Sequence, residues 1–176
     1  GNLQRQFNIF EIFDKRKYKI TFFFQGSRKG YNFLKSKCKT VYIPYSITYN
    51  QEINLIKKVG KCDYFIIEQL KIPINYQRKL KKITNKLIVF DDLLDNNYFC
   101  DVLFCCQENN NYTKVIKNHK NNILQFNYGY KYFPISRDLQ IQKKKIPSKK
   151  INNNIIISLG GGGYDKYIEN SIKVLS

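Results

Sequence analysis

The sequence contains no methionine, no alanine and no tryptophan among its 176 residues. Because no initiator methionine is present, we expect a processed chain or a piece of a longer one. The lack of alanine, together with abundant Lys, Asn, Ile, Tyr and Phe, is typical of a strongly AT-biased genome. In such a sequence lysine fills exposed positions that need any polar residue, so the net charge of +18 is weak evidence for a function.

Long apolar runs are also missing. No stretch approaches the roughly 18–20 apolar residues that a membrane-spanning helix needs, so we expect no stable membrane insertion. The first residues lack a basic segment followed by an apolar block, so no signal peptide is visible. Aromatic residues make up 15% and hydrophobic residues 43% of the chain, which excludes wholesale disorder.

Residues for metal or thiol chemistry are few. One histidine, His119, stands in a polar stretch, and we expect it at the surface and not as a base. The five cysteines form no Cys-x-x-Cys pair, so the sequence predicts no metal site, and we expect no cofactor. Their apolar surroundings indicate free thiols in a reducing, cytoplasmic compartment. They are Cys38, Cys62, Cys100, Cys105 and Cys106.

Short apolar runs alternate with helical patterns along the chain. Several runs are apolar at consecutive positions, which is typical of strands covered on both faces in a parallel sheet. Helical spacing or helix boundary residues predict helices over 3–13, 53–59 and 74–83. The fold class is therefore α/β, a Rossmann-like parallel sheet with flanking helices. The expected strands are 18–24, 39–43, 63–68, 86–90, 101–106, 122–126 and 154–158.

The composition changes near residue 138 and divides the chain into parts. Residues 1–137 are expected to form an N-terminal Rossmann-like domain. Residues 138–153 lose the apolar pattern and are rich in lysine, which predicts a solvated linker. Residues 154–176 then begin a second unit with one strand and one helical pattern, too little to bury a core. We expect that second domain to be truncated.

Three polar or glycine-rich segments are candidate ligand sites. Gly160–Gly163 joins a buried strand to a helix, where backbone N–H groups can approach a phosphate or sugar; the alternative is a flexible interdomain turn. Asn2 is either a helix cap or a ligand contact. Asp91-Asp92 follows a strand, and we expect one carboxylate to cap the next segment while the other faces a cleft.

Several segments match one family's motifs in order. They are Gly1-Asn2-Leu3-Gln4-Arg5, Phe65–Glu68, Ile88–Leu93, Asp101–Asn109, Gly129–Tyr132 with Arg137, and Ser158–Gly161. With these segments the chain resembles the nucleotide-sugar hydrolases of nonulosonic (pseudaminic-type) acid synthesis. Their wider group includes the MurG-like glycosyltransferases of the GT-B architecture. The resemblance covers nearly the whole chain.

The resemblance implies two Rossmann-like domains with a nucleotide sugar, in our expectation a UDP-sugar, in the cleft between them. It implies that the first strand of the N-terminal domain is missing from this chain. It places Asn2 at the position of the family's catalytic histidine. The implied substrate-binding residues are Gly1, Arg5, Glu68, Asp91, Ser158, Gly160, Gly161 and Gly162.

Two departures leave the function open. An amide at Asn2 cannot exchange a proton near neutral pH as a histidine does. The family's Asp-x-Tyr after the third strand is Glu68-Gln69-Leu70 here. The first hypothesis is a hydrolase-like or glycosyltransferase-like enzyme of cell-surface glycan or nonulosonic acid synthesis, in which basic residues help to hold a diphosphate. The second is a non-catalytic binding subunit.

A third hypothesis is a basic nucleic-acid-binding module. It is motivated by the net charge of +18 and by 14 tyrosines and 13 phenylalanines. Against it, the charges are spread along the chain and most aromatic residues sit in strand-like runs. We therefore expect no nucleic-acid partner.

Overall fold

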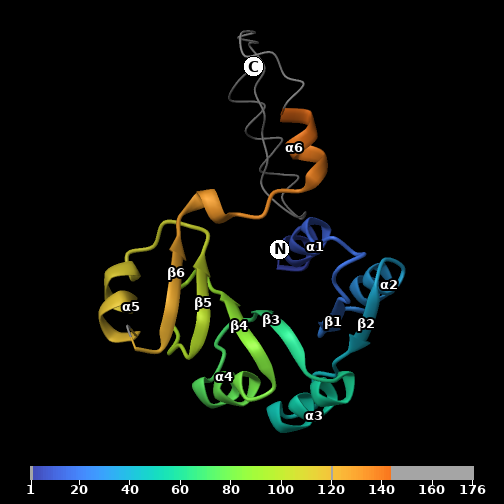
Figure 1. The fold of residues 1–176 in the computed structure, drawn as a ribbon, viewed down its shortest axis with the longest axis horizontal. Coiled ribbons are helices and arrows are strands. Elements are labelled where there is room, and N and C mark those ends of the chain that lie inside the picture. Colours follow the sequence, from blue (N-terminus) through green and yellow to red (C-terminus); the bar gives the residue numbers. More distant parts are fainter. Residues whose placement is uncertain (1, 120, 144–176) are drawn as a thin grey trace, which may run out of the picture. The chain divides into compact units, whose positions relative to one another are not determined.

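The computed structural model describes residues 2–119 and 121–143 (Figure 1). The chain divides into two units, Gly1–Ile141 and Gln142–Ser176, and the first carries the fold. Its strands are β1 (Thr21–Phe24), β2 (Lys39–Tyr42), β3 (Cys62–Glu68), β4 (Thr84–Phe90), β5 (Cys100–Cys105) and β6 (Ile123–Tyr128). The helices are α1 (Asn2–Ile12), α2 (Arg28–Lys35), α3 (Tyr49–Val59), α4 (Ile74–Lys81), α5 (Tyr112–His119) and α6 (Arg137–Lys143), with a 3₁₀ turn, η1, at Tyr130–Tyr132.

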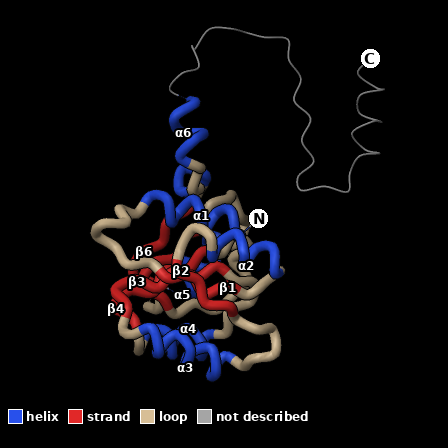
Figure 2. Tube along the Cα trace, turned by 90° about the vertical axis from the view of Figure 1, so that its right-hand side faces the viewer, coloured by secondary structure: helices blue, strands red, loops and turns tan. Residues whose placement is uncertain are grey.

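The strands form parallel sheets flanked by helices. One sheet has the order β3-β4-β5-β6 and the other pairs β1 with β2, and every pair is parallel. In Figure 2, α1 and α2 lie on one side of the strands and α3 and α4 on the other. The predicted α/β class with a parallel sheet is confirmed, as are six of the seven expected strands. The seventh, 154–158, lies outside the described residues.

Burial on both faces explains the consecutive apolar residues of the larger sheet. Leu87, Val89 and Leu103 are fully buried in β4 and β5. Tyr76 and Leu80 of α4 pack on the same core, which also receives Ile53 and Ile56 of α3. Ile88 and Phe104 alternate with the fully buried residues along β4 and β5, so they point to the opposite face, and they are partly buried there. Each of these strands therefore carries apolar side chains at consecutive positions.

The predicted helices 3–13, 53–59 and 74–83 correspond to α1, α3 and α4. At the start of α3, Thr48 and Gln51 form a reciprocal capping box, and Gly60 with φ of 104° ends the helix. The short helices α2 and α5 were not predicted, because each buries a single apolar side chain, Leu34 or Val115. The first residues of the expected linker, 138–143, are helical in α6.

None of the helices in the described part of the chain has the length and apolarity needed to cross a membrane.

Helix α1 connects the two sheets. Its Phe10 ring packs on Phe22 of β1 with 5.5 Å between centroids, and its Arg5 binds Glu68 at the end of β3. On β1 and β3 themselves, the rings of Phe23 and Phe65 lie 6.3 Å apart. Within residues 2–119 and 121–143, β1 is not paired with β3, and no other strand pairs with both of them. Side chains therefore hold the two sheets together, without hydrogen bonds between these strands.

The central position of β5 predicts a large effect of truncating Leu103. Leu103→Ala removes a fully buried side chain and should lower the free energy of unfolding by about 2–5 kcal/mol. Urea denaturation followed by circular dichroism measures the loss. The matched control is Leu124→Ala in β6, where the side chain is 81% exposed and little change is expected. Equal losses in the two variants would contradict the described core.

Candidate functional site

A buried ion-pair cluster lies where β3 and β4 end. The Arg5 guanidinium on α1 donates from Nε to Glu68 Oε1 at 2.9 Å and from Nη1 to Asp92 Oδ2 at 2.5 Å. Its Nη2 also contacts Glu68 Oε1. The Gln6 amide donates to the other Glu68 oxygen at 2.8 Å. One arginine from α1, distant in sequence from both carboxylates, thus joins the ends of two neighbouring strands. We call Arg5, Gln6, Glu68 and Asp92 the edge cluster.

Local structure places each member of the edge cluster. Glu68 is the last residue of β3, and Asp92 follows the last residue of β4 by two positions. Since β3 and β4 are parallel and Glu68 pairs with Phe90, the two carboxylates arrive at the same edge of the sheet. Consecutive residues Arg5 and Gln6 then reach this edge from the first turns of α1.

The edge cluster is largely shielded from water. The side chains of Arg5, Glu68 and Asp92 are 11%, 4% and 13% exposed. Burial alone would lower the pKa of Arg5, but hydrogen bonds and charges from Glu68 and Asp92 outweigh it and raise the pKa. The guanidinium also lies about 6 Å from the Phe90 and Phe133 rings, a cation–π distance. One positive and two negative charges leave the cluster with a net charge of −1.

Asp91, the neighbour of Asp92, has a structural role in this fold. Its carboxylate accepts from the backbone N–H groups of Leu93 and Leu94, from the Asn96 amide at 2.6 Å and from the Tyr98 hydroxyl at 2.8 Å. Burial, and then the nearby Asp91 charge, raise the pKa of Tyr98. Asp91 therefore caps the loop after β4, while Asp92 faces Arg5, as expected for one carboxylate of the pair.

Other segments of the resemblance meet at the same edge. The Cys106 backbone N–H donates to Asp92 Oδ1 at 2.7 Å, and the Asn109 amide donates to the Asp92 carbonyl at 2.7 Å. The segment after β6 reaches the edge through Phe133, which lies against Arg5. The buried Asn8 amide of α1 donates to the Pro134 carbonyl at 2.9 Å, which fastens that segment to α1.

The sequence-predicted site residues fall into three groups. Arg5 and Glu68 are brought together, whereas Asp91 is turned into the loop it caps. Asn2 is the first residue of α1, one turn before Arg5. Leu70, at the position of the family's tyrosine, is 68% exposed in the turn after β3. Gly1, Ser158, Gly160, Gly161 and Gly162 lie outside the described residues.

The sequence named Asp91 as a substrate-binding residue, whereas the structure places Asp92 beside Arg5. Gln6 was not singled out. One feature of the sequence does distinguish the roles of Asp91 and Asp92. An aspartate that precedes a turn tends to accept hydrogen bonds from the backbone two and three residues on, which assigns the cap to Asp91 and leaves Asp92 to face Arg5. Gln6 carried no comparable signal, because one glutamine on a helix is ordinary surface chemistry.

The residues near the edge cluster give little support for thiol, histidine or metal chemistry. Burial raises the pKa of Cys106 to about 11 and that of Cys100 to about 12, so both thiols stay protonated at neutral pH. His119 ends α5 and packs against Tyr98, 5.4 Å between ring centroids, and partial burial lowers its pKa. Among the residues that the structure describes, no group of three His, Cys, Asp or Glu side chains is placed to hold a metal ion.

The edge cluster predicts a large stability cost for removing its cation. Arg5→Ala leaves Glu68 and Asp92 buried without a positive partner and should lower the free energy of unfolding by about 3–5 kcal/mol. Adding Glu68→Gln should recover part of that loss, because one uncompensated charge is removed. Thermal and urea unfolding measure both variants.

The control for Arg5 is Arg16→Ala. Arg16 is 91% exposed and pairs with its sequence neighbour Asp14, so little change is expected there. If Arg5→Ala unfolded no more easily than Arg16→Ala, the edge cluster would not connect α1 to the larger sheet.

Thiol labelling tests whether the edge is closed to water. Cys105 and Cys106 are fully buried, whereas Cys38 and Cys62 are half-buried. In the native protein we expect iodoacetamide to label Cys105 and Cys106 at least about ten-fold more slowly than Cys38, because only the thiolate reacts. Peptide mass spectrometry follows each site. Equally fast labelling of Cys106 would show an edge open to solvent.

Comparison of the chain with protein-family models and with curated proteins found no match. The chemistry of the edge cluster is therefore the basis for assigning a function.

Proposed function

We propose that the protein processes nucleotide sugars, as a UDP-sugar hydrolase-like or glycosyltransferase-like enzyme with two Rossmann-like domains in a GT-B arrangement. One observation supports this above the others. Arg5, Glu68, Asp92 and Asn109 come from successive motifs of the resemblance and gather at one edge of the structure. That edge holds the carboxyl ends of parallel strands, where open α/β sheets bind ligands.

The charge of the edge cluster favours the sugar over the phosphates as the part of the ligand that it contacts. Two carboxylates face the single positive charge of Arg5, so the cluster has a net charge of −1, which repels a diphosphate. Carboxylate and amide oxygens accept hydrogen bonds from sugar hydroxyls. Basic residues were expected to hold the diphosphate, and Arg5 does not suit that role. Gly160–Gly163, which the sequence predicts to approach a phosphate or sugar, is outside the described residues.

Within the edge cluster, Asp92 is the proposed contact and Glu68 a positioning residue. The Asp92 side chain is 13% exposed and Glu68 only 4%. Glu68 engages Arg5 and Gln6 together, so it fixes the rotation of α1 and the place of its first turn. Asn2, at that first turn, can hydrogen-bond a hydroxyl but cannot relay a proton, which favours transfer over hydrolysis.

The proposed domain contains one more parallel strand, between β1 and β3. Both strands have one paired neighbour among the described residues, and α1 packs on both sheets. With a strand inserted there, the order becomes β2-β1-new-β3-β4-β5-β6, the 3-2-1-4-5-6 arrangement of doubly wound folds with one strand added at its end. Such a strand would end beside Glu68 and lead directly into α1.

A non-catalytic relative is the second candidate. It is favoured by Asn2 in the histidine position and by the exposed Leu70 in the tyrosine position. Such a protein would bind a nucleotide sugar without releasing the nucleotide. Its binding site would be the same edge.

Ligand binding by the full-length protein tests the proposal. A panel of UDP-, CMP- and GDP-sugars is added, and both the melting temperature and nucleotide release are followed. We expect a UDP-sugar to raise the melting temperature, because a ligand that binds only the folded state stabilises it. Asp92→Asn should weaken that binding by about ten-fold, the loss of one charge-assisted hydrogen bond.

The matched control is Asp95→Asn, an exposed aspartate in the loop after β4, which should bind as the unaltered protein does. Binding with release of nucleotide supports an enzyme, and binding without release supports the non-catalytic relative. If no nucleotide sugar shifts the melting temperature, the proposed function is wrong.

A further inference from the structure

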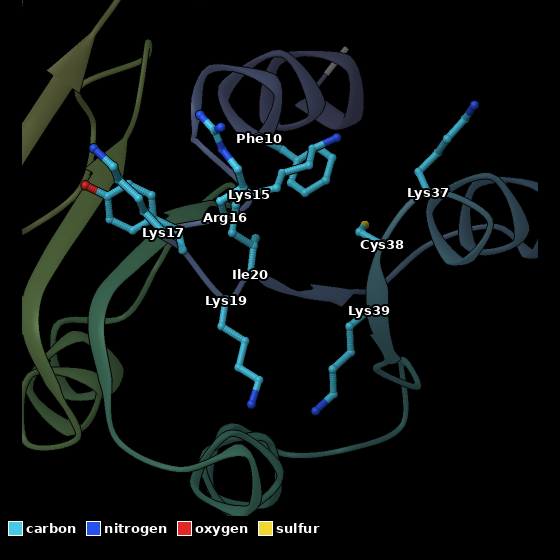
Figure 3. A pocket seen from close by; sticks show the side chains of 10 residues that line it. Phe10, Lys15, Arg16, Lys17, Lys19, Ile20, Lys37, Cys38 and Lys39 are labelled. Carbon is cyan, nitrogen blue, oxygen red and sulfur yellow. The ribbon is translucent and has the colours of Figure 1, made fainter.

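A basic hollow lies at the far end of α1 from the edge cluster. It has a volume of about 470 Å³ and opens between the segment that follows α1 and the starts of β1 and β2 (Figure 3). Phe10, Ile20 and Cys38 contribute its less polar lining. We call this cavity the basic hollow. The cationic side chains that line it are Lys15, Arg16, Lys17, Lys19, Lys37 and Lys39.

The charge of the basic hollow is nearly uncompensated. All six cationic side chains are exposed, and the described lining residues include no carboxylate. Asp14 is adjacent in sequence and accepts from Arg16 Nε at 3.2 Å, which offsets one charge. Five lysines remain around a concave surface. Such a density of one sign focuses the field and raises the local concentration of anions.

The fold itself brings these lysines together. Lys15, Lys17 and Lys19 precede β1, and Lys37 and Lys39 lie before and at the start of β2. Because β1 and β2 are parallel and Thr21 pairs with Lys39, both segments arrive at the same edge of their sheet. Figure 3 shows Lys19 and Lys39 extending in the same direction from these two segments, and Lys15 lies 4.4 Å from the Phe10 ring centroid.

We propose that the basic hollow is a binding site for a compact anion that carries several phosphate groups, such as an inorganic or nucleoside polyphosphate. The volume lies within the range of small-molecule sites, roughly 300–1,000 Å³. Lys19 and Lys39 extend in the same direction from two neighbouring segments, so one short chain of phosphates can contact both ammonium groups. A flat bilayer would touch only the rim, and a nucleic acid would need a stripe of charge along its backbone.

This inference is independent of the proposed function. The edge cluster has a net charge of −1 and lies at the carboxyl ends of β3 and β4, whereas the basic hollow lies at the amino ends of β1 and β2. A ligand in the basic hollow therefore makes no contact with Arg5 or Asp92. An anion bound there would therefore be distinct from the proposed sugar donor.

Calorimetric titration of the full chain with tripolyphosphate at low ionic strength tests the inference. Lys19→Gln/Lys39→Gln should weaken binding by about ten-fold, the loss expected for two ammonium–phosphate contacts. Lys57→Gln/Lys58→Gln on α3 is the matched control, since it removes the same net charge from two exposed lysines outside the hollow. The control should change the affinity less than about two-fold.

Three results would overturn the inference. Equal weakening in both double variants would show that binding follows net charge and not the basic hollow. Tripolyphosphate that does not bind the unaltered chain would exclude the site. Loss of binding to an RNA oligonucleotide or to phosphatidylserine vesicles in the hollow variant, with tripolyphosphate binding unchanged, would assign the lysines to a macromolecule. The UDP-sugar-induced rise in melting temperature should persist in Lys19→Gln/Lys39→Gln, which separates this test from that of the proposed function.

Discussion

The contact between Arg5 and the carboxylates of Glu68 and Asp92 is the interaction on which the rest of the structure depends. Helix α1 packs on the β1–β2 sheet through Phe10, but it reaches the larger sheet through this ion-pair cluster. Three charges buried to this degree are stable only as a satisfied network, because each would be costly alone. The network therefore fixes one position of α1 and places its first turn at the carboxyl edge of β3 and β4.

The two ends of α1 differ in their electrostatic character. At its start the cluster is closed, carries a net charge of −1 and presents oxygen acceptors. Beyond its end, six exposed cations line the basic hollow, and one carboxylate, Asp14, pairs with Arg16. The net charge of +18 is therefore not a uniform property of the surface. We propose that the acidic end contacts sugar hydroxyl groups and the basic end binds phosphates, with a single helix between the two sites.

The fold class could be predicted from the sequence because buried strands produce recognisable apolar runs. Strands β4 and β5 bury Val89 and Leu103 on one face and partly bury Ile88 and Phe104 on the other, so these residues stand in apolar runs that can be recognised. Helices α2 and α5 bury one residue each and carry no such pattern. Arg5 and Glu68 were chosen as site residues from the resemblance, yet their mutual contact joins residues 63 positions apart and depends on tertiary packing. The roles of Asp91 and Asp92 were separable only in part, because adjacent carboxylates differ in loop geometry and not in chemistry.

The central claim is that the carboxyl edge of β3 and β4 receives the sugar of a nucleotide sugar. Hydrogen–deuterium exchange of the full-length protein, with and without a saturating UDP-sugar, tests it most directly. The account predicts slower exchange in the first turn of α1 and in residues 91–94, with no change at residues 15–20 or 37–39. Protection confined to the basic hollow, or no protection at the edge while the ligand is bound, would contradict it.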